Sequence, residues 1–116
     1  MNIDSIREFC LSLPSVTEDI KWDNDLVFSV GSKMFCVAGL EPTTFKCAFK
    51  VGDDEFEEIS IQDGFMPAPY MARAKWVLLT NPAKLNKQQW QQYIRQSYGL
   101  VKAKLTRKLR RELGID

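Results

Sequence analysis

The stretch that decides the fold spans residues 26–40 and reads Leu26-Val27-Phe28-Ser29-Val30-Gly31-Ser32-Lys33-Met34-Phe35-Cys36-Val37-Ala38-Gly39-Leu40. Two runs rich in β-branched and aromatic residues flank the pair Gly31-Ser32, which suits a two-residue hairpin loop. The turn residues Asp23-Asn24-Asp25 come directly before the first run. The stretch therefore predicts an antiparallel β-hairpin.

The β pattern continues on both sides of this hairpin. Residues 18–22 alternate between polar and apolar side chains before it, and Glu41-Pro42-Thr43 turns the chain into a further β-rich run over 44–51. These segments predict an antiparallel meander of three or four strands. The apolar run at 76–79 predicts one more short strand, which brings the expected sheet to about five strands. Residues 60–74, with one glycine and two prolines, predict an irregular loop.

Helical spacing marks the two ends of the chain. Ile3, Ile6, Cys10 and Leu13 recur at helical intervals after the possible caps Asn2 or Asp4, and Pro14 stops this first helix. A short acidic helix is expected over 53–59.

A long final helix is expected after the cap Asn86, with a buried stripe at steps of three and four residues: Trp90, Ile94, Ser97, Tyr98, Val101 and Leu105. Gly99 within it suggests a close packing contact. Thr106 is a candidate cap for a separate terminal helix, at which the long helix would bend.

Length and composition indicate one globular α+β domain over residues 1–116. The chain has 45% hydrophobic and 27% charged residues, which is ordinary for a folded domain. No apolar run approaches the roughly 20 residues that cross a bilayer. The first five residues do not resemble a secretory signal, so we expect a cytoplasmic protein without membrane contact.

The residue inventory excludes several kinds of chemistry. The chain has no histidine, which removes Ser-His-Asp and Cys-His catalysis and histidine zinc sites. The cysteines Cys10, Cys36 and Cys47 have spacings that fit no metal pattern, and we interpret them as buried thiols, with a redox role as the alternative. We expect no catalytic residue, no cofactor and no metal, and we rank an enzyme below a binding protein.

Charge divides the chain into two halves. Residues 1–66 hold 5 Lys/Arg and 13 Asp/Glu, a net charge of −8, whereas residues 67–116 hold 11 Lys/Arg and 2 Asp/Glu, a net charge of +9. The densest group is the cationic segment, defined here as Lys102, Lys104, Arg107, Lys108, Arg110 and Arg111. Such asymmetry indicates either an anionic partner for one face or mutual neutralisation of the halves.

The cationic segment has two interpretations. On one continuous helix, Lys104, Arg107, Lys108 and Arg111 fall within an arc of about 100°. Bases near a helix C-terminus interact favourably with the helix dipole, so a solvated helix end is one interpretation. An anion-binding surface is the other, because neighbouring like charges repel and exceed what the dipole requires.

Several stretches together resemble the MmcQ/YjbR family of small bacterial proteins. They are Arg7-Glu8-Phe9-Cys10-Leu11-Ser12-Leu13-Pro14-Ser15-Val16-Thr17-Glu18-Asp19, Val27-Phe28-x-Val30-Gly31-x-Lys33-Met34-Phe35, Phe45-Lys46-Cys47, Tyr70-Met71-x-Arg73-x-Lys75-Trp76 and Ser97-Tyr98-x-Leu100-Val101-x-x-Lys104-Leu105. The resemblance covers nearly the whole chain. It implies a CyaY-like fold, an antiparallel sheet backed by helices, and DNA binding through two β-hairpin wings.

Three further cations, each within a stretch that carries the resemblance, complete the candidate nucleic-acid-binding residues. The full set is Lys46, Arg73, Lys75, Lys102, Lys104, Arg107, Lys108, Arg110 and Arg111. Family members often carry Asn and His near the tryptophan, where this chain has Ala72 and Lys75, and Lys75 keeps that position cationic. Trp76 is interpreted as core, or else as a stacking platform; Lys46 is a surface lysine or else a phosphate contact.

Three functions follow in order. The first is low-specificity DNA binding through the cationic half of the chain. The second is a protein-interaction or chaperone-like module, which docks a partner or a second copy through opposite charges or through the loop at 65–71. The third, proton transfer by Lys46 or Lys75 with a carboxylate, lacks any motif-grade spacing.

Overall fold

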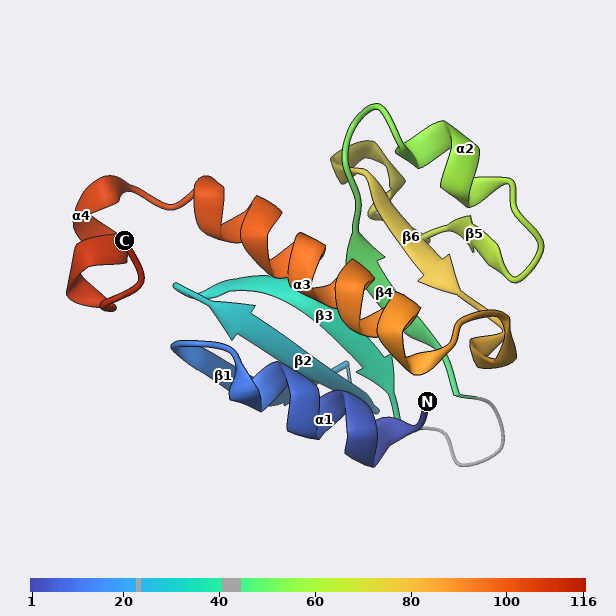
Figure 1. Ribbon diagram of the computed structural model, residues 1–116, viewed down its shortest axis with the longest axis horizontal. Helices are drawn as coiled ribbons and strands as arrows, with labels where there is room; N and C mark the ends of the chain where they lie inside the picture. Colours follow the sequence, from blue (N-terminus) through green and yellow to red (C-terminus); the bar gives the residue numbers. More distant parts are fainter. Residues whose placement is uncertain (23, 41–44) are drawn as a thin grey trace.

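Six antiparallel strands form one sheet, in the order β1-β2-β3-β4-β6-β5, in a computed structural model that describes residues 1–22, 24–40 and 45–116 (Figure 1). The strands are β1 (Val16–Lys21), β2 (Asp25–Val30), β3 (Lys33–Gly39), β4 (Cys47–Lys50), β5 (Phe65–Pro67) and β6 (Trp76–Leu79). The helices are α1 (Ile3–Ser12), α2 (Phe56–Ser60), α3 (Lys87–Ala103) and α4 (Arg107–Glu112), with short 3-10 turns η1 (Ala72–Ala74) and η2 (Pro82–Lys84). Helices α1 and α3 cover one face of the sheet, and α2 packs beside β5 and β6.

The main core fills the space between the sheet and helices α1 and α3. Phe28, Phe35 and Phe49 from the sheet are fully buried there, with Ile6 of α1 and Ile94 of α3. Burial of each such side chain contributes about 1.5–3 kcal/mol relative to exposure. The stripe predicted for the last helix is confirmed, since all of its members are buried: Trp90, Ile94, Ser97, Tyr98, Val101 and Leu105.

The predicted hairpin is β2–β3. Its loop residues Gly31 and Ser32 have φ angles of 57° and 66°, the left-handed values that a tight hairpin turn requires. A register shift next to Phe28 inserts one extra residue on β3. This bulge lets the consecutive residues Phe35 and Cys36 both reach the main core.

A smaller cluster covers the opposite face of the sheet. Val27 and Ala48 point away from the main core because strand side chains alternate between faces. They pack with Val37, Trp76 and with Ala68 from the segment that precedes η1. Trp76 is only 5% exposed, so its interpretation as a core residue is confirmed and a stacking surface is not available.

Two details of the expected fold are wrong. Residues 65–67 form the edge strand β5 inside the stretch that the sequence predicted to be a loop, which makes six strands rather than about five. Within the part of the chain that the structure describes, no atom outside its own helix segment lies within 4 Å of a Cβ built on Gly99, so the expected close contact is not found there. The prediction for Thr106 is confirmed: α3 ends at Ala103, and Thr106 caps the separate helix α4.

The predicted turn at 41–43 lies outside the described residues, as do residue 23 of the predicted turn at 23–25 and the start of the predicted strand at 44. The other caps are as expected: Asn2 caps α1 and Asn86 caps α3, each in a reciprocal capping box. Across the described ranges, no helix has both the length and the apolar character needed to cross a membrane.

Candidate functional site

Helix α4 is fixed to the rest of the fold at both of its ends. The side chain of Thr106 accepts a hydrogen bond from the Leu109 amide at the start of the helix. At its end Gly114 turns left-handed, and the amides of Gly114 and Ile115 donate to the carbonyls of Arg111 and Arg110. This Schellman motif satisfies the last carbonyls of α4 and directs Ile115 into the main core, where it is 6% exposed.

The turn between α1 and β1 provides a second attachment for α4. The Ser15 hydroxyl donates to the Leu113 carbonyl at 2.8 Å, and the Tyr98 hydroxyl of α3 donates to the Pro14 carbonyl at 2.6 Å. Leu105 and Leu109 also lie against Gly31 at the tip of the β2–β3 hairpin. The hairpin tip therefore packs at Gly31 against two leucines that lie among the bases of the cationic segment, while Ser32 and Lys33 remain exposed.

One carboxylate gathers the three arginines of α4. The Asp116 carboxylate forms ion pairs with all three. Its oxygens lie 3.1 Å from Nε of Arg110, 3.6 Å from Nε of Arg111 and 3.9 Å from Nε of Arg107. Arg110 also donates to the Leu105 carbonyl at 3.0 Å, so it closes the end of α3. Arg110 therefore has a structural role, with a side chain only 24% exposed, whereas those of Arg107 and Arg111 are 73% and 63% exposed.

The lysines of the cationic segment stand apart from this arrangement. Lys104 and Lys108 are exposed and Lys102 is half-buried, and none of the three makes an ion pair with another described residue. The exposed charge of the segment is thus carried by Lys104, Arg107, Lys108 and Arg111. The break before Thr106 leaves Lys104 at the C-cap of α3 and the other three on α4, so the single helical arc predicted for them is wrong.

A buried lysine lies close to this charge. Lys50, the last residue of β4, is 8% exposed and donates from Nζ to the carbonyl of Ala74. Its pKa is lowered by burial first and then by repulsion from Lys104 and Lys75, while Asp53 acts in the opposite direction. We call Lys50, Lys75 and Lys104 the lysine cluster. Three separate elements therefore bring positive charge to one end of the sheet.

The two cations of the predicted loop before β6 lie near this end. Arg73 belongs to η1 and is exposed. Lys75 follows with a left-handed backbone, and its Nζ lies 5.2 Å from the centre of the Phe56 ring in a cation–π contact. Because Lys75 directly precedes Trp76, the register partner of Lys50, it belongs to the same end of the sheet.

Lys46 lies at the other end. It precedes β4, is exposed, and its carbonyl accepts a hydrogen bond from Gly39 at 3.0 Å. Lys46 and Lys50 are four positions apart along the extended chain, which corresponds to about 13 Å between their Cα atoms at the usual strand rise. The structure therefore does not bring Lys46 together with the cationic segment.

The acidic half of the chain does not neutralise these bases through ion pairs. Within residues 1–22, 24–40 and 45–116, one ion pair joins an acid of the first half to a base of the second: Asp63 and Lys84, at 2.9 Å. Asp53 influences Lys50 without an ion pair. Among the described residues, the exposed arginines of α4, Arg107 and Arg111, pair with Asp116, which comes from their own half of the chain.

Two contributors to this site were not identified from the sequence. Lys50 is the last residue of an apolar strand and lies on the same face of the sheet as Ala48. This alternation of side chains between the two faces was the sequence signal that could have predicted a buried lysine. Asp116 follows the reversal at Gly114, and only the folded chain brings its carboxylate back to the arginines.

Comparison with known proteins agrees with the fold. The model of the family described as YjbR matches residues 11–100. The crystal structure of Deinococcus radiodurans protein DR2400, with a domain of the family model DUF419, is similar at a TM-score of 0.88 and 26% identity, over 99% of this chain and 89% of that one. A protein from Pseudomonas syringae has the same fold at a TM-score of 0.72 and 16% identity, over 87% of this chain and 99% of that one. No curated protein matches this chain.

Proposed function

We propose that this chain, which belongs to the YjbR family, is a nonenzymatic protein that binds the phosphate backbone of duplex DNA with little sequence preference. The observation that supports the proposal is the cationic segment, which presents four exposed bases on a fixed backbone: Lys104, Arg107, Lys108 and Arg111. Lys50 and Lys75, the other two members of the lysine cluster, add positive potential at the same end of the sheet.

The physical basis of such binding is the release of counterions from the duplex. Neutralisation of about four phosphates gives a slope near −3.6 when the logarithm of the binding constant is plotted against that of the salt concentration. Affinity then falls about a hundredfold between about 50 and 200 mM salt. Lysine and arginine contacts to phosphates fix position without reading bases, so low specificity is the expected outcome.

The direct test measures fluorescence anisotropy of a labelled duplex with two variants of equal charge. In K104Q/R107Q/K108Q, the exposed bases of the cationic segment lose three charges. In the control K21Q/K46Q/K87Q, three exposed lysines elsewhere lose the same total charge. The first variant is expected to lose most of its affinity and to show a salt slope reduced by about 2.7, at about 0.9 per lost phosphate contact.

The control is expected to keep most of the affinity and the original slope. Equal losses in the two variants would contradict the assigned surface, because binding would then follow net charge alone. No binding of the wild-type protein at about 50 mM salt would overturn DNA binding itself.

A second candidate function, self-association, is favoured by the free edge of the sheet. Strand β1 lies at that edge, and Ile20 and Trp22 are 66% and 62% exposed there. The opposite edge, β5, is only three residues long and contains Pro67, which cannot donate to a neighbouring strand.

The charges of β1 suit a second copy of the same strand. An antiparallel pair centred on Ile20 would place Asp19 opposite Lys21 of the second copy, twice by symmetry. Opposite charges on directly facing positions stabilise a strand pair by roughly 0.2–1 kcal/mol each. The two-fold axis would also bring the two Ile20 side chains together, so the same patch would serve on both partners.

Sedimentation velocity tests this arrangement. We expect a dimer at about 100 µM protein and a monomer for Ile20→Lys, which places two lysines face to face at the axis. The control Ile61→Lys introduces the same charge at a site that is 84% exposed and distant from β1. A wild-type monomer at that concentration would rule out this pairing.

A further inference from the structure

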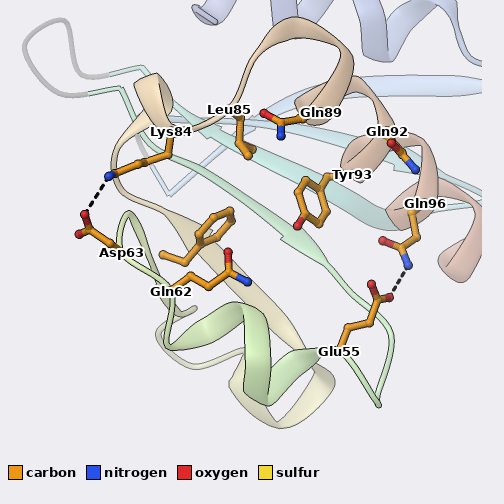
Figure 2. Close-up of a pocket in the computed structure, with 10 residues that line it drawn as sticks. Glu55, Gln62, Asp63, Lys84, Leu85, Gln89, Gln92, Tyr93 and Gln96 are labelled. Carbon is orange, nitrogen blue, oxygen red and sulfur yellow. Dashed lines mark hydrogen bonds and ion pairs between the residues drawn. The ribbon is translucent and has the colours of Figure 1, made fainter.

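A cleft lies between α3 and the segment that joins α2 to β5, with a volume of about 600 Å³. That volume is within the range of roughly 300–1,000 Å³ found for small-molecule sites. Two polar bridges span the cleft, as Figure 2 shows: Lys84 pairs with Asp63 at one end, and the Gln96 amide donates to Glu55 at the other. The space between these bridges is therefore bounded by side chains from both walls of the cleft.

The walls of the cleft carry amide groups with unused hydrogen-bonding capacity. Gln89 accepts a hydrogen bond from the Asn86 amide through Oε1, at 2.9 Å, which leaves its NH2 group available. The side chains of Gln62 and Gln92 make no hydrogen bond to another described residue. Each free amide offers both donors and an acceptor to a ligand.

Tyr93 projects from α3 into the same space (Figure 2). Its ring stacks on Phe49, with centres 5.3 Å apart, and meets the edge of Phe65 at 6.2 Å, so its position is fixed. The pKa of Tyr93 is raised by burial and by the charges of Glu55 and Glu58. Its hydroxyl, which has no partner among the described residues, therefore stays protonated at neutral pH and can donate.

The charge of the cleft selects against anions. Asp63 and Lys84 neutralise each other, which leaves the Glu55 carboxylate as the remaining charge in the lining. Phosphate or carboxylate on a ligand would meet this negative group without a free cation to balance it. Phe65 and Leu85 supply apolar surface beside the amides.

We propose that this cleft binds a nucleoside, in which an uncharged planar base and a sugar supply both donors and acceptors. Glutamine amides pair with base edges in two-point contacts, as they do with adenine in nucleic-acid complexes. Aromatic and apolar side chains favour the flat face of any base. The cleft lies along the first part of α3, away from the cationic segment, so this inference does not depend on DNA binding.

Titration calorimetry and amide NMR test the proposal with adenosine and cytidine as probes, and with AMP and glucose as comparisons. At least one nucleoside is expected to bind and to shift the side-chain amide signals of Gln62, Gln89 and Gln92. AMP is expected to bind more weakly than adenosine, because its phosphate adds negative charge near Glu55.

Two variants and a matched control locate the binding. Tyr93→Phe keeps the ring contacts and removes the hydroxyl, and Gln92→Ala removes one amide; each is expected to weaken nucleoside binding about 3- to 10-fold. The control Gln88→Ala changes an exposed glutamine of the same helix outside the cleft, and should leave binding unchanged.

Three results would overturn the proposal. They are the absence of binding by both nucleosides, an AMP affinity equal to or above that of adenosine, and glucose binding as tight as nucleoside binding. The first removes the site, the second indicates an anion site, and the third indicates that the base is not recognised. A failure of DNA binding alone would not contradict the proposal of nucleoside binding.

Discussion

Gly31 lies directly beneath Leu105: a Cβ atom on Gly31 would come within 2.7 Å of Leu105 Cδ1 and 3.2 Å of Leu109 Cδ2. The tip of the β2–β3 hairpin therefore contacts Leu105 and Leu109, which lie among the bases of the cationic segment, through a glycine, the smallest residue. Gly31 also has a φ of 57°, a conformation that L side chains rarely adopt. Packing and backbone geometry thus both favour glycine at this position.

Gly31→Ala is expected to destabilise the protein by about 1–3 kcal/mol, because it combines an unfavourable φ with a close contact to Leu105. Urea unfolding measures the loss. The matched control is Gly99→Ala, where a Cβ meets nothing within 4 Å and the backbone is helical. That variant should be more stable than the wild type by about 0.5–1 kcal/mol. Equal effects of the two substitutions would contradict the assigned contact.

Ser97→Ala is expected to cost about 2–3 kcal/mol of stability. The Ser97 hydroxyl is fully buried, accepts from the Lys50 amide at 2.9 Å and donates to the Phe35 carbonyl at 2.6 Å. It therefore joins β3 and β4 from the helix side, and its removal leaves two backbone groups unpaired in the core. Ser12→Ala, at an exposed helix end, serves as the control and should change stability by less than about 0.5 kcal/mol.

Lys50 makes stability depend on pH in the alkaline range. Its pKa in the folded protein lies below the ordinary value of 10.5, because of burial and then of repulsion from Lys104. Between the folded pKa and 10.5, the unfolded chain holds more protons at this site than the folded one, so the Lys50 contribution to stability rises with pH. Below the folded pKa this contribution is constant and unfavourable.

Lys50→Met should therefore be at least as stable as the wild type at neutral pH, and its advantage should shrink as pH rises toward 10.5. Urea unfolding of both proteins across this pH range measures the difference between their free energies of unfolding. The contributions of the other titrating groups cancel in this difference, because both proteins contain them. Lys87→Met, at an exposed site, should follow the wild-type curve. An advantage of Lys50→Met that does not change with pH would contradict the assignment.

Asp116→Asn is expected to tighten duplex binding about 3- to 10-fold at about 50 mM salt. Asp116 competes with phosphate for Arg107 and Arg111, so its neutralisation frees both guanidinium groups. Glu112→Gln changes net charge equally from an exposed position of α4 and should have the smaller effect. Fluorescence anisotropy measures the duplex affinity of both variants. Equal gains in affinity would indicate a general charge effect rather than release of the arginines.

Local patterns predicted much of the fold. The pair Gly31-Ser32 defined the hairpin, Asn86 defined the start of α3, and the spacing from Trp90 to Val101 defined its buried face. Each of these signals acts over a few residues. Strand β5 was missed because residues 65–67 have no alternation of their own, and pairing with β6 alone makes them a strand.

The candidate sites were less accessible from the sequence, because they depend on segments that meet only after folding. The cationic segment was evident as composition, but the break before Thr106 and the return of Asp116 rearranged its charges. The cleft with Gln62 and Gln92 had no sequence signal, since glutamines form no recognisable motif and its two walls are distant along the chain.

The attachment of α4 by Ile115 and by the Ser15–Leu113 hydrogen bond has a thermodynamic consequence for any polyanion that binds there. Because the backbone of this helix is already ordered, association requires little coupled folding and loses little conformational entropy. Complex formation would then proceed at a rate set by electrostatic steering, with no gain of helical circular dichroism. The same preorganisation limits how far the surface can adapt to differently shaped duplexes.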